Sequence, residues 1–143
     1  MDNCIFCKIV RGEIPCGKVY ENDETFAFVE MNPVNPGHTL IIPKRHYPSL
    51  SDIPEKELGN LMKDIKKISS GVLKAFNTSS FNLVQSNGEA AGQEVFHVHF
   101  HIIPRHEKDN KEIQWKVDNI SLEERKKIAD KIRQELSEGK DKI

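Results

Sequence analysis

The sequence predicts an α+β domain: a mostly antiparallel sheet of about five strands, packed by one long helix and followed by a C-terminal helix. Three observations predict this class. Short runs rich in β-branched and aromatic residues alternate with turn residues. One long segment carries apolar residues at helical spacing. A second amphipathic segment, rich in charge, closes the chain.

The length of 143 residues fits one domain with or without a tail, because compact domains usually span about 100–150 residues. Apolar residues make up 37 % of the chain and charged residues 30 %, which allows a core and is too polar for a membrane protein. The net charge of −1 gives no general basic field that would hold nucleic acid. No apolar run approaches the roughly 20 residues that span a bilayer.

The start, Met1-Asp2-Asn3-Cys4, has neither the basic nor the apolar region of a signal peptide. Two of the three cysteines form a tight Cys-x-x-Cys pair, Cys4 and Cys7, which favours a reducing compartment. We therefore expect a soluble, cytoplasmic protein.

The strands are predicted from runs of β-formers between turn residues. Residues 18–30 form two short strands around a turn, and the Pro- and Gly-containing segment 32–37 forms a loop. Three further strands are expected at 38–42, ended by Pro43, at 81–85, and at 96–103, closed by Pro104.

The long helix is predicted to begin near Pro54, with Ser51 or Asp52 as its cap. One face of it carries the apolar residues Leu58, Leu61, Met62, Ile65, Ile68, Val72, Leu73 and Phe76. The capping box Ser121-Leu122-Glu123-Glu124 begins the C-terminal helix, expected at about 121–137.

Three histidines alternate in the last predicted strand. His97, His99 and His101 share one face, because residues two apart in a strand point to the same side. Packing alone gives no reason for three imidazoles on one face, so this strand is the candidate for chemistry. They could bind a catalytic metal that activates water, or supply a nucleophile with a neighbouring proton donor.

The loop before this strand, residues 86–93, offers glycines, backbone N–H groups and the amide of Gln93. Glycine-containing loops can close around a phosphate. Beside the histidines, this loop suggests a phosphoryl group held against a nucleophilic imidazole.

The segment His97-Val98-His99-Phe100-His101-Ile102-Ile103 resembles the histidine-triad motif, His-φ-His-φ-His-φ-φ, of the HIT family. The Gly92-Gln93 pair, the block 32–46 and the start at 4–9 resemble that family too, in the same order. The resemblance covers residues 4–105 and is greatest to the Hint-like branch of nucleoside phosphoramidate hydrolases and its prokaryotic relatives. It implies a HIT domain at 1–106 and a C-terminal extension at 107–143.

The resemblance implies a hydrolase or transferase that acts at the α-phosphorus of a purine nucleotide derivative, such as the phosphoramidate of AMP. His99 would be the nucleophile, His101 the hydrogen-bond donor or acid, and His38 would position and polarise His99. Dinucleoside polyphosphate hydrolysis (of the Ap4A or Ap3A type) and a non-catalytic nucleotide-binding regulatory dimer are the alternatives. The family forms two-fold dimers, so a homodimer is expected.

Similarity to the family also implies the nucleotide contacts. Phe6, Ile9, Phe28 and Met31 would hold the nucleoside, with Glu30 on the ribose hydroxyls. The phosphate would be held by Ser86, Asn87, Gly92 and Gln93. Glu30, Ser86 and Glu94 depart from the residues that relatives often carry, and we expect Glu94 to turn outward because a carboxylate repels a phosphate.

Cys4 and Cys7 need two further ligands to complete a tetrahedral zinc site, and His46 and His97 are the candidates. Such an ion would be structural, because four protein ligands leave no open position. A redox pair and two inert thiols are the rival readings. Cys16 has no visible partner and is expected to be buried.

Overall fold

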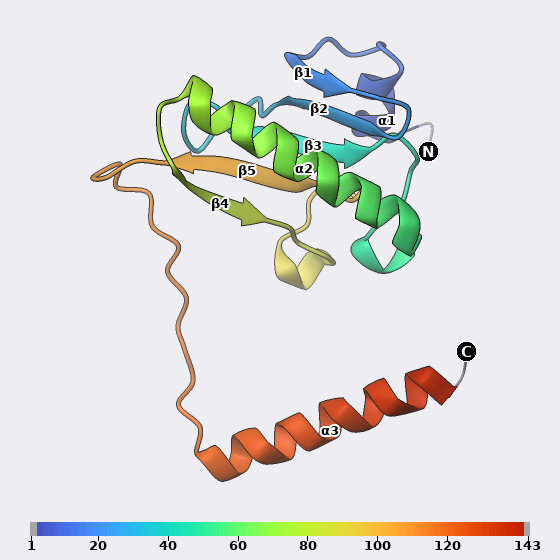
Figure 1. The fold of residues 1–143 in the computed structure, drawn as a ribbon, viewed down its shortest axis with the longest axis vertical. Helices are drawn as coiled ribbons and strands as arrows, with labels where there is room; N and C mark the ends of the chain where they lie inside the picture. The colour runs from blue at the N-terminus through green and yellow to red at the C-terminus, as the bar shows by residue number, and fades with distance from the viewer. Residues whose placement is uncertain (1–2, 142–143) are drawn as a thin grey trace. The chain divides into compact units, whose positions relative to one another are not determined.

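A computed structural model describes residues 3–141 of the chain. The helices are α1 (Ile5–Val10), α2 (Glu55–Ala75) and α3 (Leu122–Asp141), with short 3₁₀ turns at Leu50–Asp52 and Glu89–Ala91. The strands are β1 (Lys18–Glu21), β2 (Thr25–Val29), β3 (Thr39–Pro43), β4 (Ser80–Val84) and β5 (Phe100–Arg105) (Figure 1).

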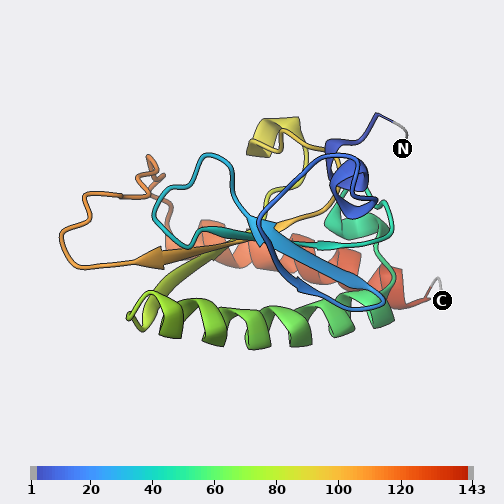
Figure 2. The same ribbon diagram turned by 90° about the horizontal axis from the view of Figure 1, so that it is seen from above.

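Within the described residues the strands form one five-stranded sheet in the order β1-β2-β3-β5-β4. Every neighbouring pair is antiparallel. Helix α2 covers one face of this sheet, and α1 lies on the other (Figure 2). The predicted α+β class, the antiparallel sheet and the long helix are therefore confirmed.

Two apolar clusters sit on opposite faces of the sheet because strand side chains alternate. On the α2 face, Ala27, Ile41 and Phe100 pack against Leu61, Ile65, Ile68 and Val72 of the helix. On the other face, Phe26, Phe28, Leu40 and Ile42 pack against Phe6 and Ile9 of α1. The predicted helix stripe is thus confirmed at its centre, while Met62 and Phe76 at its edges are exposed.

The last strand begins later than predicted. The N–H of Val98 donates to the carbonyl of Tyr47 at 2.7 Å, not to a neighbouring strand, so β5 starts only at Phe100. The strand also continues through Pro104, whose carbonyl accepts a hydrogen bond from Asn35 Nδ2 at 2.9 Å. The prolyl nitrogen therefore faces the 32–37 loop beyond the β3 pairing, where its missing N–H removes no ladder bond.

Two helix starts differ from expectation. The side chains of Ser49 and Asp52 form a capping box for a separate 3₁₀ turn, and Pro54 occupies the cap position of α2. The short helix α1 was not predicted; the Sγ of its cap residue Cys4 accepts the N–H of Cys7 at 3.4 Å.

The chain divides into a compact unit that ends at Lys111 and a second that begins at Glu112. The second contains α3, which confirms the predicted C-terminal helix and extends it to Asp141. A functional boundary at residue 106 and a two-fold homodimer stay predictions. None of the helices in the described part of the chain has a stretch long and apolar enough to cross a membrane.

Gly37 ends the loop before β3 with φ +93°, and a Cβ there would lie 2.6 Å from the Phe76 ring. Gly37→Ala should therefore lower the free energy of unfolding by about 2–4 kcal/mol, because both the backbone and the ring must shift. Gly71 lies inside α2, where a Cβ would meet nothing within 4 Å. Gly71→Ala should raise stability by up to about 1 kcal/mol. Urea denaturation of both variants tests the pair. Equal effects would contradict this account.

Candidate active site

A row of paired residues across three strands forms the floor of the site. Phe28 of β2 pairs with Leu40 of β3, and Leu40 pairs with His101 of β5. All three side chains point to the α1 face and line a cavity of about 540 Å³. The sheet register thus sets an imidazole at the end of an apolar row.

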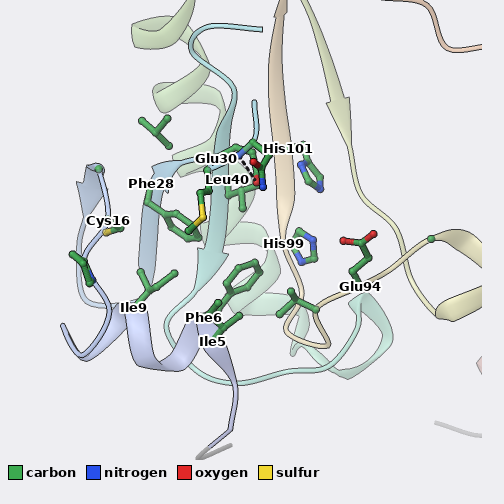
Figure 3. A pocket seen from close by; sticks show the side chains of 17 residues that line it. Ile5, Phe6, Ile9, Cys16, Phe28, Glu30, Leu40, Glu94, His99 and His101 are labelled. Carbon is green, nitrogen blue, oxygen red and sulfur yellow. Dashed lines mark hydrogen bonds between the residues drawn. The ribbon is translucent and has the colours of Figure 1, made fainter. Parts of the chain in front are cut away.

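The cavity brings together most of the predicted site (Figure 3). His99 and His101 line it with six of the predicted nucleotide-binding residues: Phe6, Ile9, Phe28, Glu30, Met31 and Gly92. Ser86, Asn87 and Gln93 are not among its lining residues. Eight further lining residues were not predicted from the sequence: Ile5, Pro15, Cys16, Gly17, Val29, Asn32, Leu40 and Val95. Of these, Ile5 could have been found, since it lies one helical turn before Ile9.

A chain of hydrogen bonds fixes the proton positions on His38 and His101. The N–H of Val34 donates to His38 Nδ1 at 3.0 Å, so His38 must carry its proton on Nε2. That nitrogen lies 2.9 Å from His101 Nδ1, which therefore accepts. The remaining proton of His101 is on Nε2. In the structure His38 thus contacts His101 directly, and any effect of His38 on His99 passes through His101.

His99 is the opposite tautomer to His101, with its proton on Nδ1 instead of Nε2. Its Nδ1 lies 2.7 Å from the backbone carbonyl of His97, which can only accept, so Nδ1 carries the proton. Nε2 of His99 is left with a free lone pair. The two adjacent rings, 5.1 Å apart between centroids, therefore offer a nucleophilic nitrogen and an N–H donor.

Burial keeps the imidazoles of His38 and His101 neutral. Burial first, and then the neighbouring His99 and His38, lower the pKa of His101 to about 4. Burial also lowers the pKa of His38, against a weaker opposing effect of Glu30. At neutral pH, His101 is therefore a hydrogen-bond donor without a positive charge.

Gln93 supports the loop before the triad. Its Oε1 accepts the N–H of Gly88 at 2.8 Å, and its Nε2 donates to the carbonyls of Pro48 at 2.7 Å and Val95 at 3.0 Å. The predicted phosphate contact by this side chain is therefore not supported. The backbone N–H groups of Gly88, Ala91, Gly92 and Gln93 are also used within the loop.

Ser86 and Asn87 also remain outside the cavity. The side chain of Asn87 accepts the N–H of Leu50 at 2.7 Å and contacts Gln85. It thereby ties the loop to the segment that precedes α2.

Two expectations about single residues are wrong. Glu94 lines the cavity instead of turning outward, and Figure 3 shows its carboxylate on the side of His99 and His101. Cys16 is exposed and lines the cavity instead of being buried in a core. Both residues lie in irregular segments, where no periodicity in the sequence indicates direction.

The four predicted metal ligands converge at one point. The ligand atoms of Cys4, Cys7, His46 and His97 all lie within 4.8 Å of one another. Nδ1 of His97 lies 3.5 Å from Cys4 Sγ and 3.6 Å from Cys7 Sγ, and Nδ1 of His46 lies 3.4 Å from Cys7 Sγ. A tetrahedral zinc site with Zn–S of about 2.3 Å and Zn–N of about 2.0 Å has an S–N edge of about 3.5 Å.

The surroundings of the cluster suit a divalent cation as well. Nε2 of His97 donates to the carbonyl of Pro43 at 2.7 Å, which leaves Nδ1 as the ligand atom. Burial and Cys4 raise the pKa of the Cys7 thiol to about 11, so this thiol needs a cation to become a thiolate at neutral pH. The residues present therefore fit a structural metal site.

The alternative catalytic metal site on the triad does not form. Among the described residues, the clusters able to hold a metal are the Cys/His group and Glu30 with His38 and His101. His99 belongs to neither, and Nδ1 of His97 faces the thiols.

The pKa of His101 also predicts a response to acid. The folded-state pKa of about 4 lies below the ordinary 6.5, so the unfolded chain takes up the proton first as pH falls. The contribution of this neutral imidazole to stability is complete above that ordinary value and is lost as the pH falls toward the folded value. Solvent screening reduces it to on the order of 1–2 kcal/mol.

His101→Asn should therefore shrink the difference in unfolding free energy between about pH 7 and about pH 4.5, measured by urea denaturation. His106→Asn removes an exposed imidazole and is the matched control. An unchanged difference in His101→Asn would contradict the burial argument.

Comparison with known proteins places this geometry in a family. The HIT domain family model matches residues 11–108. An uncharacterised HIT-like protein of Methanocaldococcus jannaschii is 49 % identical over 85 % of this chain and 94 % of its own length. An adenosine 5′-monophosphoramidase of Saccharomyces cerevisiae is 40 % identical over 96 % of this chain and 85 % of its own. An adenylylsulfatase of Arabidopsis thaliana is 48 % identical over 76 % of this chain, which spans 55 % of that longer protein.

Solved structures agree with the sequence relatives. A HIT family protein from Bacillus subtilis has a TM-score of 0.86 at 38 % identity, covering 92 % of this chain and 96 % of its own. A Zn-bound histidine triad family protein from Mycobacterium smegmatis has a TM-score of 0.74 at 30 % identity, covering 82 % and 85 %. The matching family model, these relatives and the shared fold confirm the resemblance seen in the sequence, and the chain belongs to the HIT domain family.

Proposed function

We propose that this protein is a nucleotide hydrolase of the HIT type that cleaves a nucleoside phosphoramidate, such as that of AMP, through a nucleotidyl intermediate on His99. The observation that carries the proposal is the pair of opposite tautomers at the cavity. His99 presents a lone pair on Nε2, and His101 presents an N–H beside it. A phosphoryl group between them would meet a nucleophile and a hydrogen-bond donor together.

In the first step, Nε2 of His99 attacks the α-phosphorus in line with the leaving nitrogen. A P–N bond to the imidazole forms, the P–N bond to the amine breaks, and the amine leaves with one proton taken up from water. The proton stays on His99 Nδ1, which donates to the His97 carbonyl, and this hydrogen bond stabilises the positive charge of the phosphorylated ring. His101 Nε2–H donates to the phosphoryl oxygens or to the leaving group.

In the second step, water attacks the phosphorus and the bond to His99 breaks. The nucleoside monophosphate leaves, and the proton of the attacking water returns to solvent. Positioning and charge stabilisation supply most of the catalysis of phosphoryl transfer, and both are present in fixed backbone and imidazole contacts.

The apolar end of the cavity supports a nucleoside as the other half of the substrate. Phe6, Phe28 and Leu40 are buried there, and the rings of Phe6 and His99 pack edge to face with centroids 5.1 Å apart. Aromatic and aliphatic walls suit the faces of a base, and a purine is the base that we propose. Glu30, at the same cavity, is the proposed contact to the ribose hydroxyls.

The relatives support the same reaction class. One is named an adenosine 5′-monophosphoramidase and another an adenylylsulfatase, and both names describe cleavage of an adenylyl compound. We propose that the present chain acts on such a compound, with an amine as the leaving group, as a two-fold dimer in the cytoplasm.

We also propose that the metal held by Cys4, Cys7, His46 and His97 is zinc. The tetrahedral S–N spacings and the Zn-bound relative support this choice. When bound, zinc supplies a cross-link and no catalytic step, because all four ligands come from the protein. The chain's own residues then connect α1 to the segments that carry His46 and His97.

His99→Asn should lower kcat for adenosine 5′-phosphoramidate by roughly a thousandfold or more, about 4 kcal/mol of barrier, because the nucleophilic nitrogen is lost. AMP should still bind, since the apolar walls are unchanged. Steady-state hydrolysis and calorimetric AMP titration measure the two effects. His106→Asn, at an exposed position outside the cavity, should keep the wild-type rate.

Other outcomes discriminate among the functions. Equal activity of wild type and His99→Asn would exclude His99 as the nucleophile. A wild-type protein that binds AMP and hydrolyses neither the phosphoramidate nor a dinucleoside polyphosphate would be a binding module, not an enzyme.

Cys4→Ser and Cys7→Ser should each abolish stoichiometric zinc, measured by plasma mass spectrometry of protein prepared in zinc. Cys16→Ser should retain it, because Cys16 lies outside the cluster. A strong chelator should lower the thermal midpoint of wild type, and activity should fall only in step with unfolding. Loss of activity with an unchanged circular dichroism spectrum would instead indicate a catalytic metal.

A further inference from the structure

The cavity runs from a mainly apolar end at Ile9 and Phe28, past the two imidazoles, to Glu94 (Figure 3). Phe6, Ile9 and Phe28 are buried, His99 and His101 are half-buried, and Glu94 is exposed. A nucleotide bound with its base among the aromatic residues and its phosphorus at the imidazoles would extend its leaving group toward the Glu94 end. This step rests on the function proposed above.

The charged side chains that line this cavity are all negative. Among the described residues that line it, the side chains with a full charge at neutral pH are Glu30 and Glu94, and no lysine or arginine faces it. Glu30 accepts the N–H of Asn32 at 3.2 Å, and Glu94 forms no hydrogen bond or ion pair with any residue between 3 and 137 in the structure. In the view of Figure 3, the two imidazoles lie between these carboxylates.

The leaving group therefore meets an unpartnered carboxylate, and no lysine or arginine among the described lining residues offsets its charge. An anionic group would be repelled there, and a cationic one would be attracted. The leaving amine also becomes more positive in the reaction, because an alkylamine that departs and takes up a proton becomes an ammonium ion. The carboxylate of Glu94 favours this change. A sulfate or polyphosphate leaving group gains negative charge instead.

We propose that Glu94 is a specificity-determining residue, which favours nucleotidyl amides with a positively charged leaving amine and disfavours anionic leaving groups. It acts through charge alone and takes no covalent part in the reaction. Since unit charges a few ångströms apart near a protein surface interact strongly, the expected discrimination is roughly tenfold for each unit of leaving-group charge.

Three amides of AMP test this with the same P–N bond and nearly the same shape. Their amines are 1,2-diaminoethane, propylamine and β-alanine, so the substituents are cationic, neutral and anionic. For wild type, kcat/KM should fall in that order. Glu94→Gln, which keeps the shape and removes the charge, should bring the three values together, and Glu94→Lys should reverse the order. Glu89→Gln, at an exposed loop position outside the cavity, should behave as wild type.

The same compounds are titrated into His99→Asn protein, which does not turn them over, to separate this inference from the proposed function. One outcome is that wild type hydrolyses none of the compounds, that affinity falls in the order cationic, neutral, anionic, and that Glu94→Gln removes this order. The proposed hydrolase function is then wrong, and the role of Glu94 stands. If wild type hydrolyses all three equally, or Glu94→Gln keeps the wild-type order, the role of Glu94 is overturned. Equal affinities together with no turnover would overturn both.

Discussion

The antiparallel pairing of β3 with β5 is the constraint on which the rest of the site depends. It sets Leu40 opposite His101, and it brings the residue before β3, His38, within 2.9 Å of that imidazole. A slip of one residue would turn His101 toward α2 and bury it among Leu61 and Ile65. The two apolar faces of the sheet exclude that register, so packing on both faces fixes the chemistry inside the cavity.

Backbone groups, not charged side chains, then determine the protonation of the triad. The N–H of Val34 sets the tautomer of His38, and through it leaves His101 with its proton on Nε2. The carbonyl of His97 accepts from His99 and leaves that ring with a free lone pair on Nε2. The 32–37 loop that carries Val34 is fixed in turn by Asn35, which donates to the carbonyl of Pro104 and to Asp109. Asp109 is itself held by Arg105, and this ion pair keeps the pKa of the carboxyl well below its ordinary value. The geometry of the reacting atoms thus extends into a network outside the cavity.

Periodic features could be predicted from the sequence, and features that depend on distant partners could not. The stripe of α2 and the shared face of the histidines follow from periods of 3.6 and two residues, whereas β2 and β3, buried on both faces, follow from their runs of β-forming residues. The start of β5 depends on the carbonyl of Tyr47, which no local pattern indicates. The directions of Gln93, Glu94 and Cys16 depend on how irregular segments fold against the sheet. The metal ligands could be predicted because residue chemistry selects them, whereas their convergence required the fold.

The contacts of His97 limit how this pocket can be redesigned. Its Nδ1 faces the two thiols, its Nε2 holds the carbonyl of Pro43, and its own carbonyl is the acceptor for His99. His97 therefore contacts three parts of the site at once: the N-terminal helix, the end of β3 and the nucleophile. The position of α1 and the orientation of the attacking nitrogen of His99 both depend on this residue. A helix α1 taken from another sequence therefore has to place two thiols at the same distance from His97. Glu94 also lines this pocket, and its side chain can be replaced without breaking a hydrogen bond among the described residues.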